Sequence, residues 1–230
     1  MDTPLSAALD ELLYARHSCR AFLPTPVPRS EVEAILSAAS RAPSGTNTQP
    51  WRVHVLTGES LKRLSERILQ VVNDPEADAG HAEPYAYYPK RWISPYVDRR
   101  RKVGFDLYAL LGIAKGDTER MRAQFARNYA FFGAPVGLIF TIDAVMEQGS
   151  YLDYGMFLQS VMLGAKARGL DTCPQAAFTK YHRVIAEVLG LPENLSVVCG
   201  MSLGHADPDA PENRLRTERA PLSEWVAFLA

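Results

Sequence analysis

One stretch of the chain, residues 151–168, predicts a long helix that is apolar over much of its circumference. Gly169 follows it and provides a helix stop. Apolar side chains cover more than one stripe of this helix: Tyr151, Leu152, Met156, Phe157, Leu158, Val161, Met162 and Leu163. Because a surface helix needs a single apolar stripe, this one is expected to lie between two surfaces, such as a core and a second subunit.

Shorter patterns on both sides of this helix predict a mixture of helices and strands. Apolar residues at helical spacing indicate helices at about 3–16, 28–42, 61–68, 118–132 and 181–189. Alternating or continuous apolar runs indicate strands at 51–57, 134–142, 172–177 and 195–202. Helices dominate and short strands lie scattered between them, which favours the α+β class. No internal repeat divides the chain, so residues 1–230 are expected to form one domain.

Residues 73–116 break this pattern. They are rich in Pro, Tyr, Trp and Arg, show no sustained period, and are predicted to be an irregular, lid-like insertion. Aromatic and cationic side chains of this kind can form a roof over a small molecule. The residues expected to contact a substrate in this way are Tyr85, Tyr88, Trp92 and Arg99. The same composition fits an exposed arm whose aromatics pack on a partner subunit while its arginines stay solvated.

Charge, cysteines and the first residues narrow the function classes. The net charge of −1 gives no basic field for nucleic acid, and the apolar run 134–142 is far below the roughly 20 residues that span a bilayer. Residues 1–10 lack the basic and apolar parts of a signal peptide, so we expect a cytoplasmic protein. Three scattered cysteines, Cys19, Cys173 and Cys199, fit free thiols and predict no metal site. Neither a Rossmann glycine motif nor a P-loop occurs.

Residues 16–20 form the first segment with recognisable chemistry. In an extended chain Arg16, Ser18 and Arg20 point to one side. At roughly 3.3 Å per residue, the two arginines are based about 13 Å apart. One arginine with its neighbouring hydroxyl suits a phosphate group, and the second suits a heterocycle that becomes anionic on reduction. A solvated basic turn is the alternative explanation for so short a pattern.

Residues 42–51 form the second such segment, a run of small and amide side chains between a predicted helix and a predicted strand. Asn47 and Gln49 can both donate and accept hydrogen bonds, and Gly45 allows close approach of the backbone. Pro43 and Pro50 stiffen the two ends. Such a loop is suited to form a rigid hydrogen-bonding wall of a ligand site. It is equally consistent with a simple polar turn.

Together the two segments resemble the paired N-terminal signature of the nitroreductase family of FMN enzymes, and residues 43–51 are the more specific part. The resemblance extends to residues 132–135, 174–178 and 200–221, so it covers nearly the whole chain. It implies a central, mostly antiparallel sheet flanked by helices in an intertwined homodimer. It also implies two FMN sites at the dimer interface, where the polar side chains of residues 44–49 come from the partner subunit. NADH or NADPH would be the electron donor.

The resemblance also implies roles for particular residues. Arg16 and Ser18 would hold the phosphate or ribityl chain of FMN, and Arg20 would reach the pyrimidine edge. Arg219 matches the family's phosphate-binding arginine, although Thr217 stands where several members carry lysine. The residues expected to bind the cofactor are Arg16, His17, Ser18, Arg20, Pro43, Ser44, Gly45, Asn47, Gln49, Asn128, Pro174, Gln175, Ala176, Ala177, Gly204, Arg216 and Arg219.

The implied chemistry takes place on the cofactor, so no catalytic side chain is expected. Ala176 and Ala177 replace a Glu-Gly pair of some members and would line the flavin near N5 through backbone groups, while Asn128 is the candidate for an amide near the ring. The implied activity is hydride transfer from NAD(P)H to a nitroaromatic, quinone or similar electron-poor acceptor. The same motifs permit reductive dehalogenation or breakdown of the flavin itself. A protein that binds FMN or an aromatic ligand without turnover is the alternative from another class.

Overall fold

The two most apolar predicted strands become the middle of the sheet. The computed structural model describes residues 3–229, so Met1, Asp2 and Ala230, including the start of the segment inspected for a signal peptide, lie outside the described part. Four strands pair in the order β1-β2-β4-β3, and every pairing is antiparallel. The strands are β1 (Arg52–Thr57), β2 (Val136–Asp143), β3 (Asp171–Gln175) and β4 (Leu195–Gly204). The expected α+β class and antiparallel sheet are confirmed.

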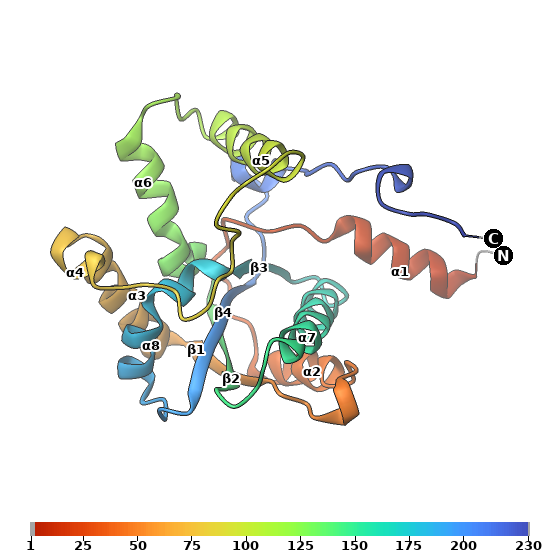
Figure 1. The fold of residues 1–230 in the computed structure, drawn as a ribbon, viewed down its shortest axis with the longest axis horizontal. Coiled ribbons are helices and arrows are strands. Elements are labelled where there is room, and N and C mark those ends of the chain that lie inside the picture. The colour runs from red at the N-terminus through yellow and green to blue at the C-terminus, as the bar shows by residue number, and fades with distance from the viewer. Residues whose placement is uncertain (1–2, 230) are drawn as a thin grey trace.

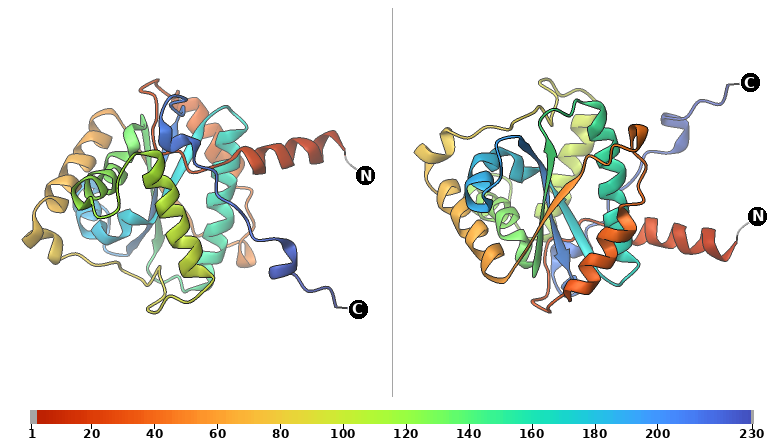
Figure 2. Two further views of the ribbon diagram at one scale, coloured as in Figure 1. Left: turned by 90° about the horizontal axis from the view of Figure 1, so that it is seen from above. Right: turned by 90° about the horizontal axis from the view of Figure 1, so that it is seen from below.

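Helices cover both faces of this sheet, which gives three layers (Figures 1 and 2). The helices are α1 (Pro4–Ala15), α2 (Arg29–Ala39), α3 (Gly58–Val72), α4 (Pro75–Ala79), α5 (Tyr96–Leu110), α6 (Thr118–Ala126), α7 (Gly149–Lys166) and α8 (His182–Leu189). One face of the sheet packs against α2 and α7, and the other against α3 and α8. Burial on both faces explains why β2 is apolar at nearly every position instead of alternating.

Short 3-10 helices complete the chain. They are η1 (Gly45–Asn47), η2 (Arg127–Gly133), η3 (Ala176–Tyr181), η4 (Pro211–Arg214) and η5 (Leu222–Glu224). None of the helices formed by residues 3–229 is both long and apolar enough to cross a bilayer.

Every predicted helix and strand is present, with ends shifted by a few residues. The prediction of an irregular segment at 73–116 was wrong in part, because α5 fills Tyr96–Leu110. This helix buries no side chain, so it carries no apolar period that the sequence could reveal. The prediction of helix throughout 118–132 was wrong at its end. There α6 gives way to η2, in which Phe131 and Phe132 adopt φ values of 49° and 54°.

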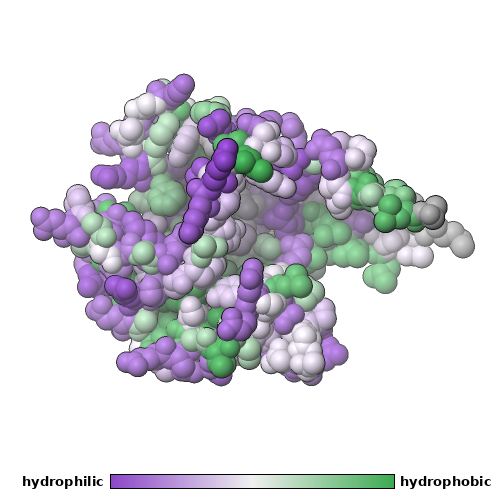
Figure 3. Space-filling model, viewed as in Figure 1, coloured by the Kyte–Doolittle hydropathy of each residue, from purple (hydrophilic) through white to green (hydrophobic). Residues whose placement is uncertain are grey.

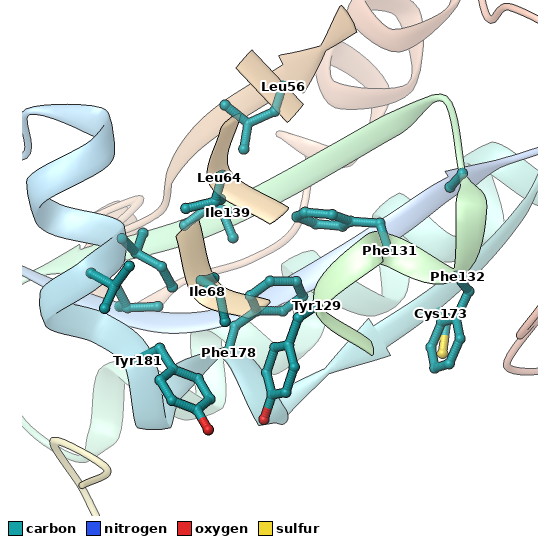
Figure 4. Close-up of a cluster of buried hydrophobic side chains, with 14 of the residues drawn as sticks. Leu56, Leu64, Ile68, Tyr129, Phe131, Phe132, Ile139, Cys173, Phe178 and Tyr181 are labelled. Carbon is teal, nitrogen blue, oxygen red and sulfur yellow. The ribbon is translucent and has the colours of Figure 1, made fainter. Parts of the chain in front are cut away.

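Aromatic side chains fill the space between the sheet and α3 and α8 (Figure 4). The rings of Phe131 and Phe178 lie 4.6 Å apart, and Tyr129 stands edge-on to Phe178. Gly200 of β4 makes room for this cluster, because a Cβ atom there would lie 2.3 Å from the Phe178 ring. The cluster fixes η2 and η3, the two short helices that frame the end of β3.

Three parts of the chain lack cover inside the described structure. The helix α1 buries no residue and leaves Leu5 and Tyr14 at least four-fifths exposed. The C-terminal segment, which is residues 205–229 after β4, leaves Trp225 and Phe228 exposed. Its end projects from the same side of the molecule as α1, where apolar surface is visible (Figures 1 and 3). On the outer side of α7, Leu152 is 73% exposed. The inner side of α7 packs on the sheet, which is one of the two surfaces predicted for this helix, and its outer side leaves Leu152 exposed.

Candidate functional site

The first signature segment is extended, as the sequence predicts. Ser18 forms a parallel bridge with Thr172 of β3, and the Cys19 N–H donates to the Thr172 carbonyl at 3.0 Å. The following residues run beside 205–207 on the other side. Cys19 is completely buried, whereas Ser18 and the basic residues at positions 16 and 20 are half-buried. The alternation of an extended chain thus separates a core face from a polar face.

Arg16, Ser18 and Arg20 all influence one buried thiol, that of Cys173. Burial raises the pKa of Cys173 to about 11. Three neighbours act against this rise, in order of size: the charge of Arg20, a hydrogen bond with Ser18 and the charge of Arg16. Because all three influence the same sulfur atom, they lie on one side of the segment, which agrees with the prediction from spacing.

Arg16 also lies close to Arg219 of the C-terminal segment. The pKa of the Arg16 guanidinium is lowered, first by burial and then by the positive charge of Arg219. No carboxylate of residues 3–229 lies within ion-pair distance of Arg16, Arg20, Arg216 or Arg219. Two mutually repelling arginines beside a hydroxyl, without an acidic partner, form the donor set of a phosphate site. These residues therefore fit the phosphate of FMN.

The two arginines of the C-terminal segment are oriented by their own turn. Arg219 donates to the Thr217 hydroxyl at 2.7 Å and to the Thr217 carbonyl at 3.1 Å. Arg216 donates to the carbonyls of Asn213 and Leu215. Thr217 therefore serves as an acceptor that orients Arg219.

His17 belongs to the first signature segment, and one of its ring nitrogens has no partner among the described residues. Its Nδ1 is 3.2 Å from the Ala15 carbonyl oxygen and 4.0 Å from the Asp171 carboxylate. Its Nε2 is buried and has no hydrogen-bond partner in the described chain. Burial is the largest cause that lowers the pKa of His17, so the ring is neutral at neutral pH. A buried, unpaired polar atom is one that a bound ligand can satisfy.

The end of β3 brings Asn128 and Gln175 together, but the Gln175 side chain is not open to a ligand. Gln175 is 3% exposed, and its Nε2 donates to the Asn128 carbonyl at 2.7 Å. Its Oε1 accepts a hydrogen bond from the Ser202 hydroxyl at 2.7 Å. The side-chain amide of Gln175 is therefore occupied within the chain, and a contact of this residue with the cofactor stays a prediction that its backbone would have to meet. Pro174 next to it is exposed, and the half-buried Ala176 and Ala177 begin η3.

Gly204 also differs from its expected role. It is the last residue of β4 and is buried. A Cβ atom at this position would lie 2.7 Å from Pro135 Cδ and 3.3 Å from Phe22 Cδ1. Close packing therefore accounts for the glycine without any ligand.

The second signature segment is exposed and lies elsewhere. Pro43, Gly45, Asn47 and Gln49 are exposed, and Ser44 is half-buried. Within the loop, the Gln49 N–H donates to the Ser44 hydroxyl at 3.0 Å, and Gln49 Nε2 donates to the Asn47 carbonyl at 3.2 Å. The polar side chains therefore satisfy part of their capacity within the loop.

A single side chain of α7 fastens this loop to the body of the molecule. The Gly45 N–H donates to Asp153 Oδ2 at 3.2 Å, near the start of α7. The first signature segment instead pairs with Thr172, which follows the other end of α7. Since α7 has 18 residues and is about 27 Å long, the chain does not bring its two signature segments together.

The predicted aromatic roof divides into separate places. Tyr85 lines a cavity of about 770 Å³ together with Tyr151, Ala176 and Val198, and its hydroxyl donates to the Val198 carbonyl at 2.5 Å. Tyr85 therefore closes one side of a cavity at the end of β3.

The other three roof residues are not part of that cavity. Tyr88 and Trp92 contact each other, and the cation over both rings is Arg100. Arg99 pairs with Glu224 at 2.8 Å, beside the C-terminal segment. The four residues therefore do not line one cavity, because α5 carries Arg99 away from it, and their contact with a substrate stays a prediction.

Two residues that sequence reasoning missed hold the signature segments in place. Asp153 accepts the N–H of Gly45, and Asn213 bonds to the backbone of Arg20. These partners are 108 and 193 residues apart in the chain. At such separations no local pattern of the sequence identifies them.

Comparisons with known proteins match nearly the whole chain. The model of a family described as the nitroreductase family matches residues 13–205. The chain is 43% identical over 225 residues to the 4-nitrobenzoate reductase of Pseudomonas putida, covering 98% of this chain and 97% of that protein. It is 41% identical over 226 residues to the nitrobenzene nitroreductase of Ectopseudomonas oleovorans, covering 98% and 99%.

A solved structure shows the same architecture. The crystal structure of the FMN and NADPH-dependent nitroreductase NfnB from Sphigopyxis sp. strain HMH matches with a TM-score of 0.92. The two chains are 38% identical, and the match covers 96% of this chain and 98% of that one. Both signature segments and the cavity at the end of β3 lie within the part of the chain that the family matches.

Proposed function

This chain belongs to the nitroreductase family, and from that premise we propose that it is an FMN-dependent oxidoreductase that uses NADH or NADPH to reduce nitroaromatic compounds and similar electron-poor acceptors. One observation carries the proposal. The positive charge of Arg219 acts on Arg16, which lies two residues from Ser18 in an extended segment, and neither arginine has an acidic partner among residues 3–229. Such a group of donors suits an anion, and the phosphate of FMN is an anion of this kind.

The chain's own residues bind and orient in this proposal. Bound FMN would supply hydride transfer from the nicotinamide to the acceptor, a chemistry that belongs to the cofactor. Arg16, Ser18 and Arg219 would hold the phosphate. Arg20 would lie toward the pyrimidine edge, where a fixed cation stabilises negative charge. The backbone at Ala176, where η3 begins, would line the ring.

The acceptor is proposed to enter the cavity that Tyr85 closes. Tyr151 and Leu158 of α7 and Val198 of β4 provide apolar and aromatic walls on which a flat ring can pack. These walls restrict water around the transferred hydride. No side-chain acid is required, because solvent protons complete the reduction of a nitro group.

We further propose that each FMN site is completed by a second copy of this chain. The exposed loop of residues 43–49 lies toward the end of α7 opposite to Arg16 and Arg20. The outer side of α7, the whole of α1 and the C-terminal segment expose large apolar side chains. A homodimer would bury these surfaces and bring the loop of one subunit to the arginines of the other.

The alternatives receive less support. The two curated relatives above, more than 40% identical over nearly the full chain, are named as nitroaromatic reductases and not as dehalogenases or flavin-degrading enzymes. The same names count against a binding protein without turnover, because both relatives are named as enzymes. The three cysteines are free and buried, which suits the reducing cytoplasm that we propose as the location.

The first experiment measures cofactor and turnover together. The purified protein is reconstituted with FMN, desalted, and supplied anaerobically with NADPH and then nitrobenzene. We expect about one flavin per subunit, bleaching by NADPH, and reoxidation by nitrobenzene. Failure to retain flavin contradicts the proposed function, and retention without bleaching by NADPH or NADH favours the binding protein instead.

The second experiment tests whether two subunits share each site. Arg16→Ala and Asn47→Ala subunits are each expected to retain little FMN. After unfolding and refolding of an equal mixture, half of the dimers are mixed, and one of their two sites carries neither substitution. About a quarter of the sites should then regain FMN. If the mixture retains no more FMN than its parents, the sites are not shared.

A further inference from the structure

Asn213 fills a gap in the backbone pairing of the first signature segment. On one side the Cys19 N–H is bonded to β3, and on the other the Asp207 N–H donates to the Ala21 carbonyl at 3.0 Å. Between them, the Arg20 N–H has no backbone acceptor among residues 3–229. Asn213 Oδ1 accepts this N–H at 2.8 Å, and Asn213 Nδ2 donates to the Ala21 carbonyl at 2.8 Å.

The carboxamide of Asn213 is fully used. Its Nδ2 also donates to the Asp207 carbonyl at 2.9 Å, and the residue is 7% exposed. One acceptor and two donor contacts fix the plane of the amide. Through the Arg20 N–H and the Ala21 carbonyl they also fix the Cys19–Arg20 and Ala21–Phe22 peptides on the two sides of this dipeptide. Because a carboxamide has the donor and acceptor groups of a peptide, Asn213 takes the place of a missing strand at this point.

The side chain of Arg20 depends on this support. One of its guanidinium nitrogens donates to the Ser18 carbonyl at 3.1 Å. No acidic side chain of the described residues pairs with it. The position of this cation is therefore set largely by the backbone of residues 18–21, and a shift of that backbone moves the charge.

The turn that carries Asn213 has an independent anchor. Glu212, the preceding residue in η4, is 4% exposed and forms an ion pair with Arg127 at the start of η2. This pair ties η4 to the aromatic core rather than to the first signature segment. Asn213 thus extends from a fixed base to the backbone of Arg20.

We propose that Asn213 is a positioning residue for Arg20, and that it sets the reduction potential of the bound flavin by holding this cation at the flavin edge. The inference rests on the proposed function. A fixed positive charge beside the pyrimidine favours the reduced flavin over the oxidised one. A phosphate carries its charge in both states, so Arg16 and Arg219 retain the cofactor without tuning it. The C-terminal segment then serves both purposes, through Asn213 and through Arg219.

A double-mutant cycle on the flavin midpoint potential tests this role. Asn213→Leu, Arg20→Ala and the double variant are saturated with FMN and titrated against redox dyes. Asn213→Leu should lower the equilibrium constant for two-electron reduction about tenfold, which is about 30 mV. The double variant should reach no lower value than Arg20→Ala alone, because Asn213 acts through Arg20. An unchanged potential in Asn213→Leu, or fully additive effects, overturns the proposal.

Two further variants separate positioning from a structural role. Glu212→Gln breaks the ion pair of the same turn, so it should lower thermal stability while its effect on the potential adds to that of Arg20→Ala. Non-additivity of the same size for Glu212→Gln would show that Asn213 has no particular role. If Asn213→Leu does not fold, Asn213→Ser removes both donated hydrogen bonds and leaves room for water, with the same non-additivity expected. Loss of FMN from the unaltered protein would instead contradict the proposed function.

Discussion

The two signature segments belong to one family pattern, yet the chain builds them in opposite ways. Residues 16–22 are paired with β3 on one side and with 205–207 on the other, and Asn213 closes the remaining gap. Residues 43–49 are mostly exposed, and a single hydrogen bond to Asp153 fastens the loop to α7. Residues 16–22 are therefore held by contacts within their own chain, and we call them the braced segment. Residues 43–49 are mostly exposed to solvent, and we call them the presented segment.

The backbone of the second segment sharpens this difference. Thr46, Asn47 and Gln49 adopt φ values of 48°, 61° and 50°, in a region of backbone conformation that residues other than glycine rarely occupy. Each such residue costs about 1–3 kcal/mol and persists where surrounding structure supports it. Within the described chain that support is the set of bonds inside the loop and Asp153. We infer that each subunit completes the braced half of its own site and offers the exposed loop to its neighbour.

The largest effect on FMN affinity is expected at Arg16, which lies in the braced segment and is proposed to bind the phosphate of FMN. Arg16→Ala should weaken FMN binding by about 1.5–3 kcal/mol, roughly 10- to 150-fold, as a charged hydrogen-bond donor is lost. The unfolding free energy of the flavin-free protein should not fall, because burial and Arg219 already disfavour the Arg16 charge. Flavin fluorescence titration and urea unfolding measure the two quantities. Arg29→Ala, at an exposed surface pair with Glu33, should change neither. A loss of stability without a loss of affinity at Arg16 contradicts this assignment.

A pair of glutamines gives the next effect and compares the regions directly. Gln175→Leu leaves the Asn128 carbonyl and the Ser202 hydroxyl without their buried partner, so the unfolding free energy should fall by about 1–3 kcal/mol. Gln49→Leu removes an exposed side chain and should change it by less than about 0.5 kcal/mol. Urea unfolding of both variants without flavin, at one protein concentration, measures the difference. Equal losses would show that the two segments are braced alike.

Asp153 allows a smaller and more specific perturbation. Asp153→Ala removes the acceptor of the Gly45 N–H, which should weaken FMN binding by about 0.5–1.5 kcal/mol, roughly two- to tenfold. Since Asp153 acts through the loop, its effect should disappear in an Asn47→Ala background and add to that of Arg16→Ala. Flavin titration of the single and double variants measures this coupling. If the effect of Asp153→Ala couples to Arg16 instead, the helix and not the loop transmits it.

Much of the braced region could be predicted from the sequence. The alternation of Arg16, Ser18 and Arg20 follows from extended geometry alone, and the antiparallel sheet and most helices follow from apolar periodicity. What could not be predicted are partners far apart in the chain. The amide of Asn213 and the inward turn of Gln175 depend on tertiary contacts that no local pattern encodes.

The helix inside residues 73–116 could not be predicted for a different reason. The helix α5 buries no residue in the described chain, so its sequence carries no apolar stripe. Aromatic composition suggested one roof, but the start of α5 separates Tyr85 from Arg99. Composition therefore predicted a segment of aromatic and cationic side chains without showing which of these residues lie together.

The smallest expected effect concerns pH and again separates the two segments. The pKa of His17 is lowered, first by burial and further by the charges of Arg216 and Lys166, while the Ala15 carbonyl and Asp171 act in the opposite direction. A folded pKa below the unfolded value of 6.5 means that the unfolded chain binds more protons between these two values. His17 therefore contributes stability that is present above about pH 6.5 and is lost as the pH falls through its folded pKa.

His17→Gln should remove this contribution, so the flavin-free variant should lose less unfolding free energy than the unaltered protein between about pH 7.5 and 5.5. His54 and His182 also have lowered pKa values through burial, so a shallower slope and not a flat one is expected. Residues 43–51 contain no group that titrates in this range, so Asn47→Ala should keep the full slope. Urea unfolding at several pH values measures all three proteins. If His17→Gln keeps the unaltered slope while Asn47→Ala reduces it, the pH sensitivity resides in the exposed loop and its contacts, and the division between a braced and a presented segment is wrong.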